Sequence, residues 1–291
     1  MNRRLSSVTP YALLAPAFIV TLFVLGYPLL YEVVMSFRHM DLRFLDTGRF
    51  IGFKNYVMLA HDPLLWKSII NTIVITVPTV ALEILGGLAI ALLLNREFRG
   101  QSIVRTLLIV PMLLTPAAVA LIWNFMFWTD NGMLNYLLSL AKLSGINWLG
   151  DPRVAPIAII ISEVWQETSF VFLILFAGLQ ALPQELPEAA RVDGASWWQE
   201  LTHITLPFLK PVMLVALLFR TMFTLRMFDK IFILTEGGPG NATSTLSIYL
   251  YKKFFYFFDV GYASAVAWLL VIITALIGFI YMRMMWSEVE I

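Results

Sequence analysis

The stretch IINTIVITVPTVALEILGGLAIALLLN, residues 69–95, decides the fold of this chain. It carries a single ionisable side chain, that of Glu83, within a long apolar run. A helix rises ~1.5 Å per residue, so about 20 apolar residues cross the ~30 Å hydrocarbon layer of a bilayer. The stretch is therefore long enough to cross a membrane once, and a helix satisfies its own backbone hydrogen bonds there.

Runs of the same kind recur along the rest of the chain. Besides 69–95, we place apolar spans at 11–37, 106–128, 154–182, 211–228 with an extension toward 234, and 263–285. Of the 291 residues, 59% are hydrophobic and 13% are charged, which is more apolar surface than one soluble core would normally bury. The sequence predicts an all-α membrane protein with six transmembrane helices. An even number of crossings places both termini on one side of the membrane.

Composition also removes several classes of function. Cysteine is absent, which excludes a disulfide framework, a thiolate metal site and a cysteine nucleophile. The formal net charge is +1 without a basic cluster, and this argues against nucleic acid as a partner. Arg3 and Arg4 precede the first apolar run, as in a signal peptide, but the run is too long for one and lacks a small-residue cleavage site. We expect it to be retained as the first span.

Lysine and arginine give only a weak indication of orientation. If the N-terminus is cytoplasmic, eight of these residues lie on the inside and nine on the outside. The positive-inside rule is therefore nearly balanced. The short 96–105 connection has the highest density of basic residues and favours the cytoplasmic side. We expect both termini and the 183–210 connection on the cytoplasmic side, and the motif in that connection is the stronger evidence for this.

The most informative connection lies between the fourth and fifth spans and includes LPEAARVDGASWW at 186–198. Pro187 suits the first position of a helix, and Glu188 complements the positive end of the helix dipole. Gly194 can adopt the left-handed conformation that ends a helix. The segment predicts two short helices joined at this glycine and projecting from the membrane. The side chains it would offer to solvent or to a partner are Arg191, Asp193, Trp197 and Trp198.

The same connection carries a sequence motif. The pattern Glu-Ala-Ala, three residues, Gly, nine residues, Ile, one residue and Leu-Pro is met in full by residues 188–207. Between two spans, it resembles the signature loop of permease subunits in type I ABC importers. The resemblance implies the permease fold of those importers, with a cytoplasmic coupling helix seated in a cleft of a separate ATPase. It assigns ATPase coupling to Glu188, Ala189, Ala190, Arg191, Asp193, Gly194 and Ala195.

A second stretch narrows the resemblance. Residues 220–249, with RMFD at 226–229 and GGP at 237–239, resemble the fifth span and the following external loop of the carbohydrate branch of these importers. Members of that branch import maltose, trehalose, other oligosaccharides and glycerol phosphate. The glycine-rich segment 237–244 lacks the lysine and the preceding strand of a phosphate-binding loop, so we interpret it as an external turn. ATP and Mg²⁺ are accordingly expected on partner ATPase subunits, with no cofactor bound by this chain.

Ionisable residues inside the spans are candidates for function because charge at membrane depth is costly. Glu163 and Glu167 lie one helical turn apart in the fourth span, and Arg220, Arg226 and Asp229 mark the fifth. Either they neutralise one another across two helices or they line a wet path that binds sugar hydroxyls, and the two readings are compatible. The resemblance supports the path, for which the candidates are Glu163, Trp165, Gln166, Glu167 and Arg226. Glu32 and Glu83 are expected to be isolated residues that snorkel or pack.

These observations predict a non-catalytic, membrane-spanning subunit of an ATP-driven, binding-protein-dependent sugar importer in a bacterial or archaeal cytoplasmic membrane. We expect the N-terminus, first span and external loop in 1–66, the permease core in 67–283 and a cytoplasmic tail in 284–291. Expected partners are a second, related permease subunit, a dimer of ATPase subunits, an extracytoplasmic solute-binding protein, membrane lipid and the sugar. The alternatives are a permease for a non-sugar solute and a secondary transporter that works alone. The latter predicts related halves, of which the sequence shows no clear sign.

Overall fold

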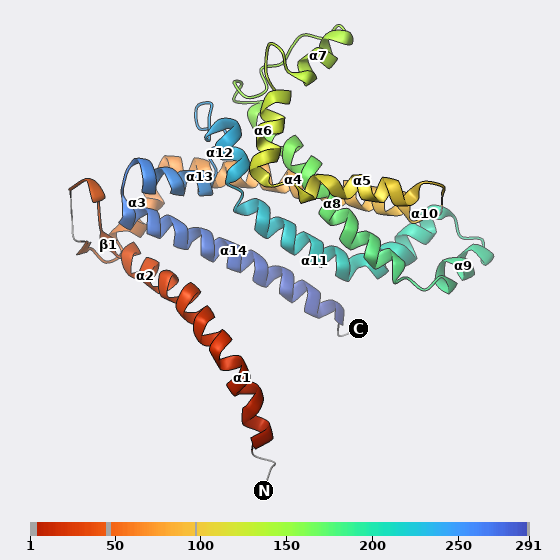
Figure 1. Cartoon of the computed structure of the whole chain (residues 1–291), viewed down its shortest axis with the longest axis horizontal. Coiled ribbons are helices and arrows are strands. Elements are labelled where there is room, and N and C mark those ends of the chain that lie inside the picture. Colours follow the sequence, from red (N-terminus) through yellow and green to blue (C-terminus); the bar gives the residue numbers. More distant parts are fainter. Residues whose placement is uncertain (1–4, 45–47, 97, 290–291) are drawn as a thin grey trace. The chain divides into compact units, whose positions relative to one another are not determined.

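The computed structural model describes residues 5–44, 48–96 and 98–289. The chain is helical over most of its length and divides into two compact units. The first unit comprises the chain up to Pro63 together with Leu250–Ile272, and the second comprises Leu64–Tyr249 with the chain from Ile273 onward. Figure 1 shows the order of the helices along the chain.

The first unit begins with one long helical run and continues into a small polar assembly. α1 (Leu5–Thr21), a π-helical turn (Leu22–Gly26) and α2 (Tyr27–Ser36) follow one another without a break. Next come the antiparallel strands β1 (Arg38–His39) and β2 (Arg49–Phe50), with a 3-10 turn (Leu42–Phe44) between them, and then α3 (Lys54–His61). Asn55 of α3 donates hydrogen bonds to the carbonyls of Ser36 and Arg38, at 2.8 and 2.9 Å, and so fixes the end of α2.

The second unit holds the long packed helices. Its elements are α4 (Pro63–Leu94), α5 (Gln101–Leu113), α6 (Pro116–Met126), α7 (Met133–Leu140), α8 (Ala155–Gln180), α9 (Glu185–Val192), α10 (Trp197–Glu200), a π-helical turn (Leu201–Thr205), α11 (Leu206–Leu225), α12 (Asp229–Thr235) and α13 (Leu246–Tyr251). A π-helical turn (Lys252–Tyr256) then leads to α14 (Val260–Val289), which takes part in both units.

Two apolar clusters hold the second unit together. One joins α4, α8 and α11 through residues such as Ile84, Phe172 and Leu209, and the other joins α6, α8 and α12. Gly87 sets the distance between α4 and α8, because a Cβ atom there would lie 2.6 Å from Cγ1 of Val171 and 2.9 Å from the backbone nitrogen of Phe172. Only glycine permits so close an approach, as is common for small residues between membrane helices.

The apolar helices agree with a protein that crosses the membrane several times. Among the described residues, five helices are long and apolar enough to cross: Leu13–Ser36, Pro63–Leu94, Ala155–Gln180, Trp197–Leu225 and Val260–Met285. A sixth crossing is obtained if α5 and α6 are taken together as one broken span. The fifth expected span begins earlier than the sequence suggested, because α10, the π-helical turn and α11 form one continuous helix.

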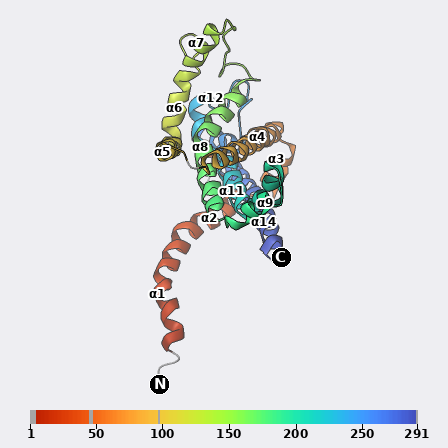
Figure 2. The ribbon, with the colours of Figure 1, turned by 90° about the vertical axis from the view of Figure 1, so that its right-hand side faces the viewer.

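The third expected span, 106–128, is broken rather than straight. α5 and α6 meet at an angle of 98°, and Figures 1 and 2 show α6 leaving the direction of α5. The break falls at Thr115, whose extended backbone (φ −67°, ψ 145°) is the conformation that a following proline, Pro116, imposes. The Thr115 hydroxyl accepts a hydrogen bond from the nitrogen of Ala118 at 3.3 Å and caps the start of α6. The expected span 106–128 is therefore divided into two helices at Pro116.

Candidate functional site

The connection between α8 and α11 folds into a compact helical hairpin, here called the coupling hairpin and defined as residues 185–205. Its first helix, α9, begins at Glu185, so Pro187 is the third helical residue and the expectation of a proline at the first position is wrong. Proline is still tolerated there, because backbone N–H groups in the first turn have no partner within the helix. Glu185 and Glu188 also lie in this turn, where their charge favours the helix dipole.

Gly194 ends α9 in the expected left-handed conformation, with φ +81°. Two hydrogen bonds close the turn: the nitrogen of Ala195 donates to the carbonyl of Ala190 at 2.9 Å, and the nitrogen of Gly194 donates to that of Arg191 at 3.1 Å. This pair of bonds is the Schellman motif of helix ends. A Cβ atom on Gly194 would meet no other atom within 4 Å, so the need for glycine is one of backbone conformation rather than of space.

The second half of the hairpin is held by a cap and an ion pair. Ser196 and Gln199 form a reciprocal capping box at the start of α10. Arg191 of α9 donates from Nε and Nη2 to the two carboxylate oxygens of Glu200, at 2.9 and 2.8 Å. This hydrogen-bonded pair raises the pKa of the Arg191 guanidinium above its ordinary value, so the arginine keeps its charge.

Large apolar side chains lie on the outside of the coupling hairpin. Val192 is 87% exposed and Trp198 is 67% exposed, and Leu186 and Trp197 are also exposed. Of the residues assigned to ATPase coupling, Glu188, Ala189 and Asp193 are exposed, as are Arg191 and Gly194, while Ala190 and Ala195 are partly buried. An exposed apolar surface on a rigid projection suits burial against another protein.

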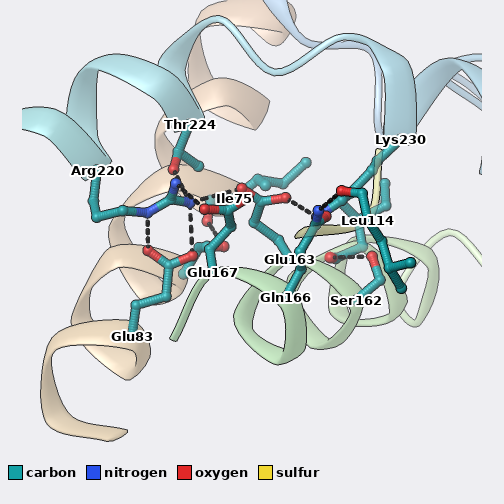
Figure 3. Close-up of polar contacts among 12 residues, drawn as sticks. Ile75, Glu83, Leu114, Ser162, Glu163, Gln166, Glu167, Arg220, Thr224 and Lys230 are labelled. Atoms are coloured by element: carbon teal, nitrogen blue, oxygen red, sulfur yellow. Dashed lines mark hydrogen bonds and ion pairs between the residues drawn. The ribbon is translucent and has the colours of Figure 1, made fainter. Parts of the chain in front are cut away.

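Deep in the second unit, Arg220 of α11 binds three carboxylates at once (Figure 3). Its Nε and Nη2 atoms donate to Glu83 of α4 at 2.8 and 2.9 Å. Nη2 also donates to Glu163 of α8 at 2.7 Å, and Nη1 donates to Glu167 of the same helix at 2.8 Å. The arginine side chain is only 3% exposed, so the contacts form in a medium of low polarity.

Lys230 of α12 completes this group, here called the Arg220 network (Glu83, Glu163, Glu167, Arg220 and Lys230). Its ammonium group binds the second oxygen of Glu163, and the lysine side chain is 2% exposed. The network therefore joins four helices, α4, α8, α11 and α12, with two cations and three carboxylates. Buried charges persist only when they are paired and hydrogen-bonded, and here each member has a partner.

One expectation about these charges requires correction. Glu83 is not isolated: it is fully buried and binds Arg220 with both oxygens. The expected neutralisation of the carboxylates of the fourth span by an arginine of the fifth is present, and Arg220 makes it. Arg226 instead donates from Nε to the carbonyl of Met222, at 3.1 Å, on its own helix. Lys230 was missed altogether. A signal for it existed, since several carboxylates in neighbouring spans require cations at a similar depth.

A cavity of about 550 Å³ lies against the Arg220 network, at the two helix breaks. Its lining includes Pro116 at the break before α6 and residues 226–228 at the break between α11 and α12. Three of the five path candidates line it, namely Glu163, Glu167 and Arg226. Asp229, Phe223 and Phe228 also line it, so the cavity offers charged groups and aromatic rings together.

The other two path candidates lie elsewhere. Trp165 is 42% exposed and lines a separate apolar groove of about 630 Å³ with residues of α4 and α5. Gln166 is 1% exposed, and its Nε2 atom donates to the carbonyl of Leu114 at 2.8 Å. That carbonyl stands at the end of α5, where the break leaves it without a helical partner. Gln166 therefore positions the α5–α6 bend.

The glycine-rich segment after α12 forms a fixed turn on α4. Lys67 donates to the carbonyl of Gly240 at 2.9 Å, and Asn71 donates to the carbonyls of Asn241 and Ser244, at 2.8 and 3.1 Å. Gly237 has a positive φ, +83°, which favours glycine at this position. The backbone of this turn is thus held by polar side chains at the start of α4, as an ordinary structural turn.

Comparison with known proteins identifies the family. Residues 83–285, which include the Arg220 network and the whole coupling hairpin, match the binding-protein-dependent transport system inner membrane components. The chain belongs to this family. It is therefore a multi-pass membrane protein and a permease subunit.

Individual relatives share most of their length with this permease. It is 36% identical over 273 residues to the trehalose/maltose transport system permease protein MalF of Thermococcus litoralis, which covers 94% of the permease and 92% of the relative. It is 38% identical over 271 residues to the sulfoquinovosyl glycerol transport system permease protein SmoG of Agrobacterium fabrum, covering 93% and 88%. The lactose transport system permease protein LacF of Rhizobium radiobacter is 33% identical over 287 residues, covering 96% and 94%.

Solved structures show the same fold. The permease resembles a chain of a bacterial ABC transporter that imports the acidic polysaccharide alginate, with a TM-score of 0.85 and 24% identity over 98% of the permease and 99% of that chain. A more distant likeness, with a TM-score of 0.55 and 17% identity, is to an amino acid ABC transporter, over 80% of the permease and 98% of that chain. The type I ABC importer permease fold expected from the sequence is confirmed.

Proposed function

We propose that this permease is one membrane-spanning subunit of an ATP-driven, binding-protein-dependent sugar importer. The names of its relatives, permeases for trehalose and maltose, sulfoquinovosyl glycerol and lactose, support a carbohydrate as the solute. A second permease chain, related but different, would complete the pathway, and a solute-binding protein would deliver the sugar from outside. A dimer of ATPase subunits would use ATP and Mg²⁺ in the cytoplasm, on the same side as both termini.

The coupling hairpin is the observation that carries this proposal. It is a rigid projection, closed by the Schellman motif at Gly194 and by the Arg191–Glu200 ion pair, and it exposes Val192 and Trp198. A surface with these features gains stability when a cleft in another protein buries its apolar side chains. The match to the signature loop of ABC permeases supports an ATPase as that protein.

Movement of the hairpin has a direct mechanical route to the membrane interior. One continuous helix extends from Trp197 to Leu225, so the second half of the hairpin and Arg220 belong to the same helical rod. The 23 positions from Trp197 to Arg220 correspond to roughly 35 Å of helix. Because Arg220 binds Glu83 and Glu163, a displacement of the rod also pulls on α4 and α8. The network thus converts motion of one helix into motion of a packed group.

The cavity beside the Arg220 network supplies this subunit's half of the solute path in the proposal. Glu167, Arg226 and Asp229 offer acceptors and donors for sugar hydroxyls, and the rings of Phe223 and Phe228 offer apolar faces for the sugar ring. Its position at two helix breaks is typical of transporter sites, where irregular backbone lines a cavity. Trp165 and Gln166 do not line this cavity.

Substitution of Gly194 tests the assignment of the hairpin. Gly194→Val should abolish sugar uptake or association with the ATPase, because a β-branched residue is strained at φ +81°, while the permease remains in the membrane. Gly194→Asn should retain activity, since asparagine tolerates the left-handed region. Gly100→Val is the matched control, because Gly100 also has a positive φ, +86°, and no other atom within 4 Å of a Cβ position. It lies outside the coupling hairpin, so this variant should retain association with the ATPase. Wild-type uptake and ATPase association in Gly194→Val would refute the assignment.

A further inference from the structure

A groove lies where the ends of α4 and α8 meet the coupling hairpin. It has a volume of about 610 Å³. One part of its wall is apolar and includes Leu92 and Leu93 of α4 and Leu179 of α8. The other part is polar and includes Arg96, Arg191, Trp197 and Glu200. A second cavity, of about 520 Å³, shares these four polar residues, so the two guanidinium groups lie at the junction of both.

The apolar part of the groove belongs to the last turns of helices that are long and apolar enough to cross a membrane. Leu92 and Leu93 are residues of the candidate span Pro63–Leu94, and Leu93 is 70% exposed. A soluble partner protein does not reach into the hydrocarbon layer, so the possible occupants are a lipid acyl chain and a helix of another membrane subunit. The guanidinium groups of Arg96 and Arg191 at the other end of the groove favour an anionic lipid over an apolar helix. Trp197 is 47% exposed beside the polar part, and tryptophan is enriched where hydrocarbon meets headgroups. The groove therefore changes from apolar to cationic in the same direction as a phospholipid does.

The polar part of the groove has guanidinium N–H groups that are available to bind an anion. Within the described ranges, Arg96 forms no ion pair with another residue. Arg191 uses Nε and Nη2 for Glu200, and its Nη1 atom makes no hydrogen bond to any other residue that the structure describes. Glu200 neutralises one of the two guanidinium groups, which leaves a net charge of +1 at the junction. Guanidinium groups bind phosphate with good geometry through paired N–H donors.

Arg96 follows an end of α4 that neighbouring side chains hold in place, and its own carbonyl accepts a hydrogen bond from Gln101 Nε2 at 3.1 Å. The carbonyl of Leu94, at the end of α4, accepts hydrogen bonds from Gln101 Nε2 at 2.6 Å and from Arg105 Nη2 at 3.2 Å. Asn95 accepts a hydrogen bond from Gln180 of α8 at 2.9 Å, which ties the turn to the end of α8. A preformed site binds with less loss of conformational entropy than one that must be ordered.

We propose that this groove binds one anionic phospholipid of the cytoplasmic leaflet, with its phosphate between Arg96 and Arg191 and an acyl chain along Leu92, Leu93 and Leu179. The proposal rests on the cytoplasmic placement of the coupling hairpin given above. Bound in this way, the lipid links the end of α4 to the hairpin without a covalent connection. The content of anionic lipid in the membrane then affects the position of the coupling hairpin, which is the part of the permease that the ATPase moves.

The test measures lipid retention by the complete importer complex. Native mass spectrometry of that complex, titrated with phosphatidylglycerol, gives the apparent dissociation constant of the first bound lipid. Arg96→Gln should weaken it about fivefold, the ratio expected for one basic residue at a membrane surface. Arg99→Gln is the matched control, because Arg99 belongs to the same loop but does not line the groove. It should leave the constant unchanged, and phosphatidylcholine should bind the wild-type complex more weakly.

Several outcomes would overturn the proposal. Equal weakening by Arg96→Gln and Arg99→Gln would show a diffuse basic surface rather than a site. Binding of phosphatidylcholine as tight as that of phosphatidylglycerol would show that the groove does not recognise the charge of the headgroup. Displacement by millimolar glycerol phosphate would make the ligand a free anion. Retention of phosphatidylglycerol only after removal of the ATPase subunits would assign the groove to that interface. Because binding is measured without transport, failure to import sugar would contradict the proposed function and leave the lipid site standing.

Discussion

The coupling hairpin and the Arg220 network place side chains in opposite surroundings. The hairpin leaves Val192 and Trp198 in contact with solvent, whereas the network encloses Arg220 and Lys230 among apolar helices. Each arrangement is unfavourable for an isolated group, because apolar surface prefers burial and charge prefers water. In the network, carboxylates of the same chain pair with the buried cations and stabilise them. In the hairpin, the exposed apolar side chains become buried only when another protein binds. This is the physical difference between a structural core and a docking element.

The largest effect should come from removing the centre of the network. Arg220→Met leaves Glu83, Glu163 and Glu167 without their shared cation, and breaking a buried ion pair from one side costs ~3–5 kcal/mol. We expect little assembled permease in the membrane and a strongly lowered melting temperature in detergent. Arg226→Met is the control, because Arg226 is exposed and contacts its own helix. A wild-type melting temperature for Arg220→Met would mean that the network does not stabilise the fold.

A second pair of variants compares how much two carboxylates of the network contribute to stability. Among the described residues Lys230 pairs with Glu163 alone, so Glu163→Gln leaves a buried ammonium group uncompensated and should lower stability by ~3 kcal/mol. Glu167→Gln should be nearly neutral, because it removes one carboxylate from a group with three carboxylates and two cations. Thermal unfolding of the two purified variants measures the difference. Equal melting temperatures would contradict this charge balance.

The hairpin should give the smallest change in stability. The Arg191–Glu200 pair is exposed on the arginine side, at 63%, and exposed pairs contribute ~0.2–1 kcal/mol. A double-mutant cycle with Arg191→Gln and Glu200→Gln should therefore show a coupling energy below ~1 kcal/mol in thermal unfolding. The number of ATP molecules hydrolysed per sugar imported should change more clearly, since the pair orients α9 on α10. A coupling energy above ~3 kcal/mol would instead make the hairpin part of the structural core.

The sequence predicted the hairpin well because its form depends on neighbouring residues. Gly194 and the helix ends around it are determined within about ten positions, and the whole motif lies within residues 188–207. The spans were also predictable, since length and apolar character decide them. Pro187 was misplaced by two positions because α9 extends further toward its N-terminus than a proline start implies.

The network was less predictable because its members are far apart in the sequence. Arg220 and Glu83 are separated by 137 positions, and no local pattern shows that they meet. The position of Trp165 could have been foreseen, since a helix turns ~100° per residue and residue 165 lies nearly opposite the face shared by 163 and 167. The break at Thr115 is intermediate. Pro116 indicates an irregularity, but the 98° bend is accompanied by a hydrogen bond from Gln166, 52 positions away, which no local pattern predicts.

The uninterrupted helix from Trp197 to Leu225 gives the hairpin and the network a common rotational phase. Deleting one residue between them would turn the hairpin by ~100° about the rod and draw it ~1.5 Å closer, so that its apolar side chains would face away from their cleft. Inserting seven residues would restore nearly the same phase while lengthening the rod by ~10 Å. The number of residues in this helix therefore fixes the angle, about the helix axis, between the docking surface of the hairpin and the buried Arg220. Helix length determines this orientation as much as side-chain chemistry does.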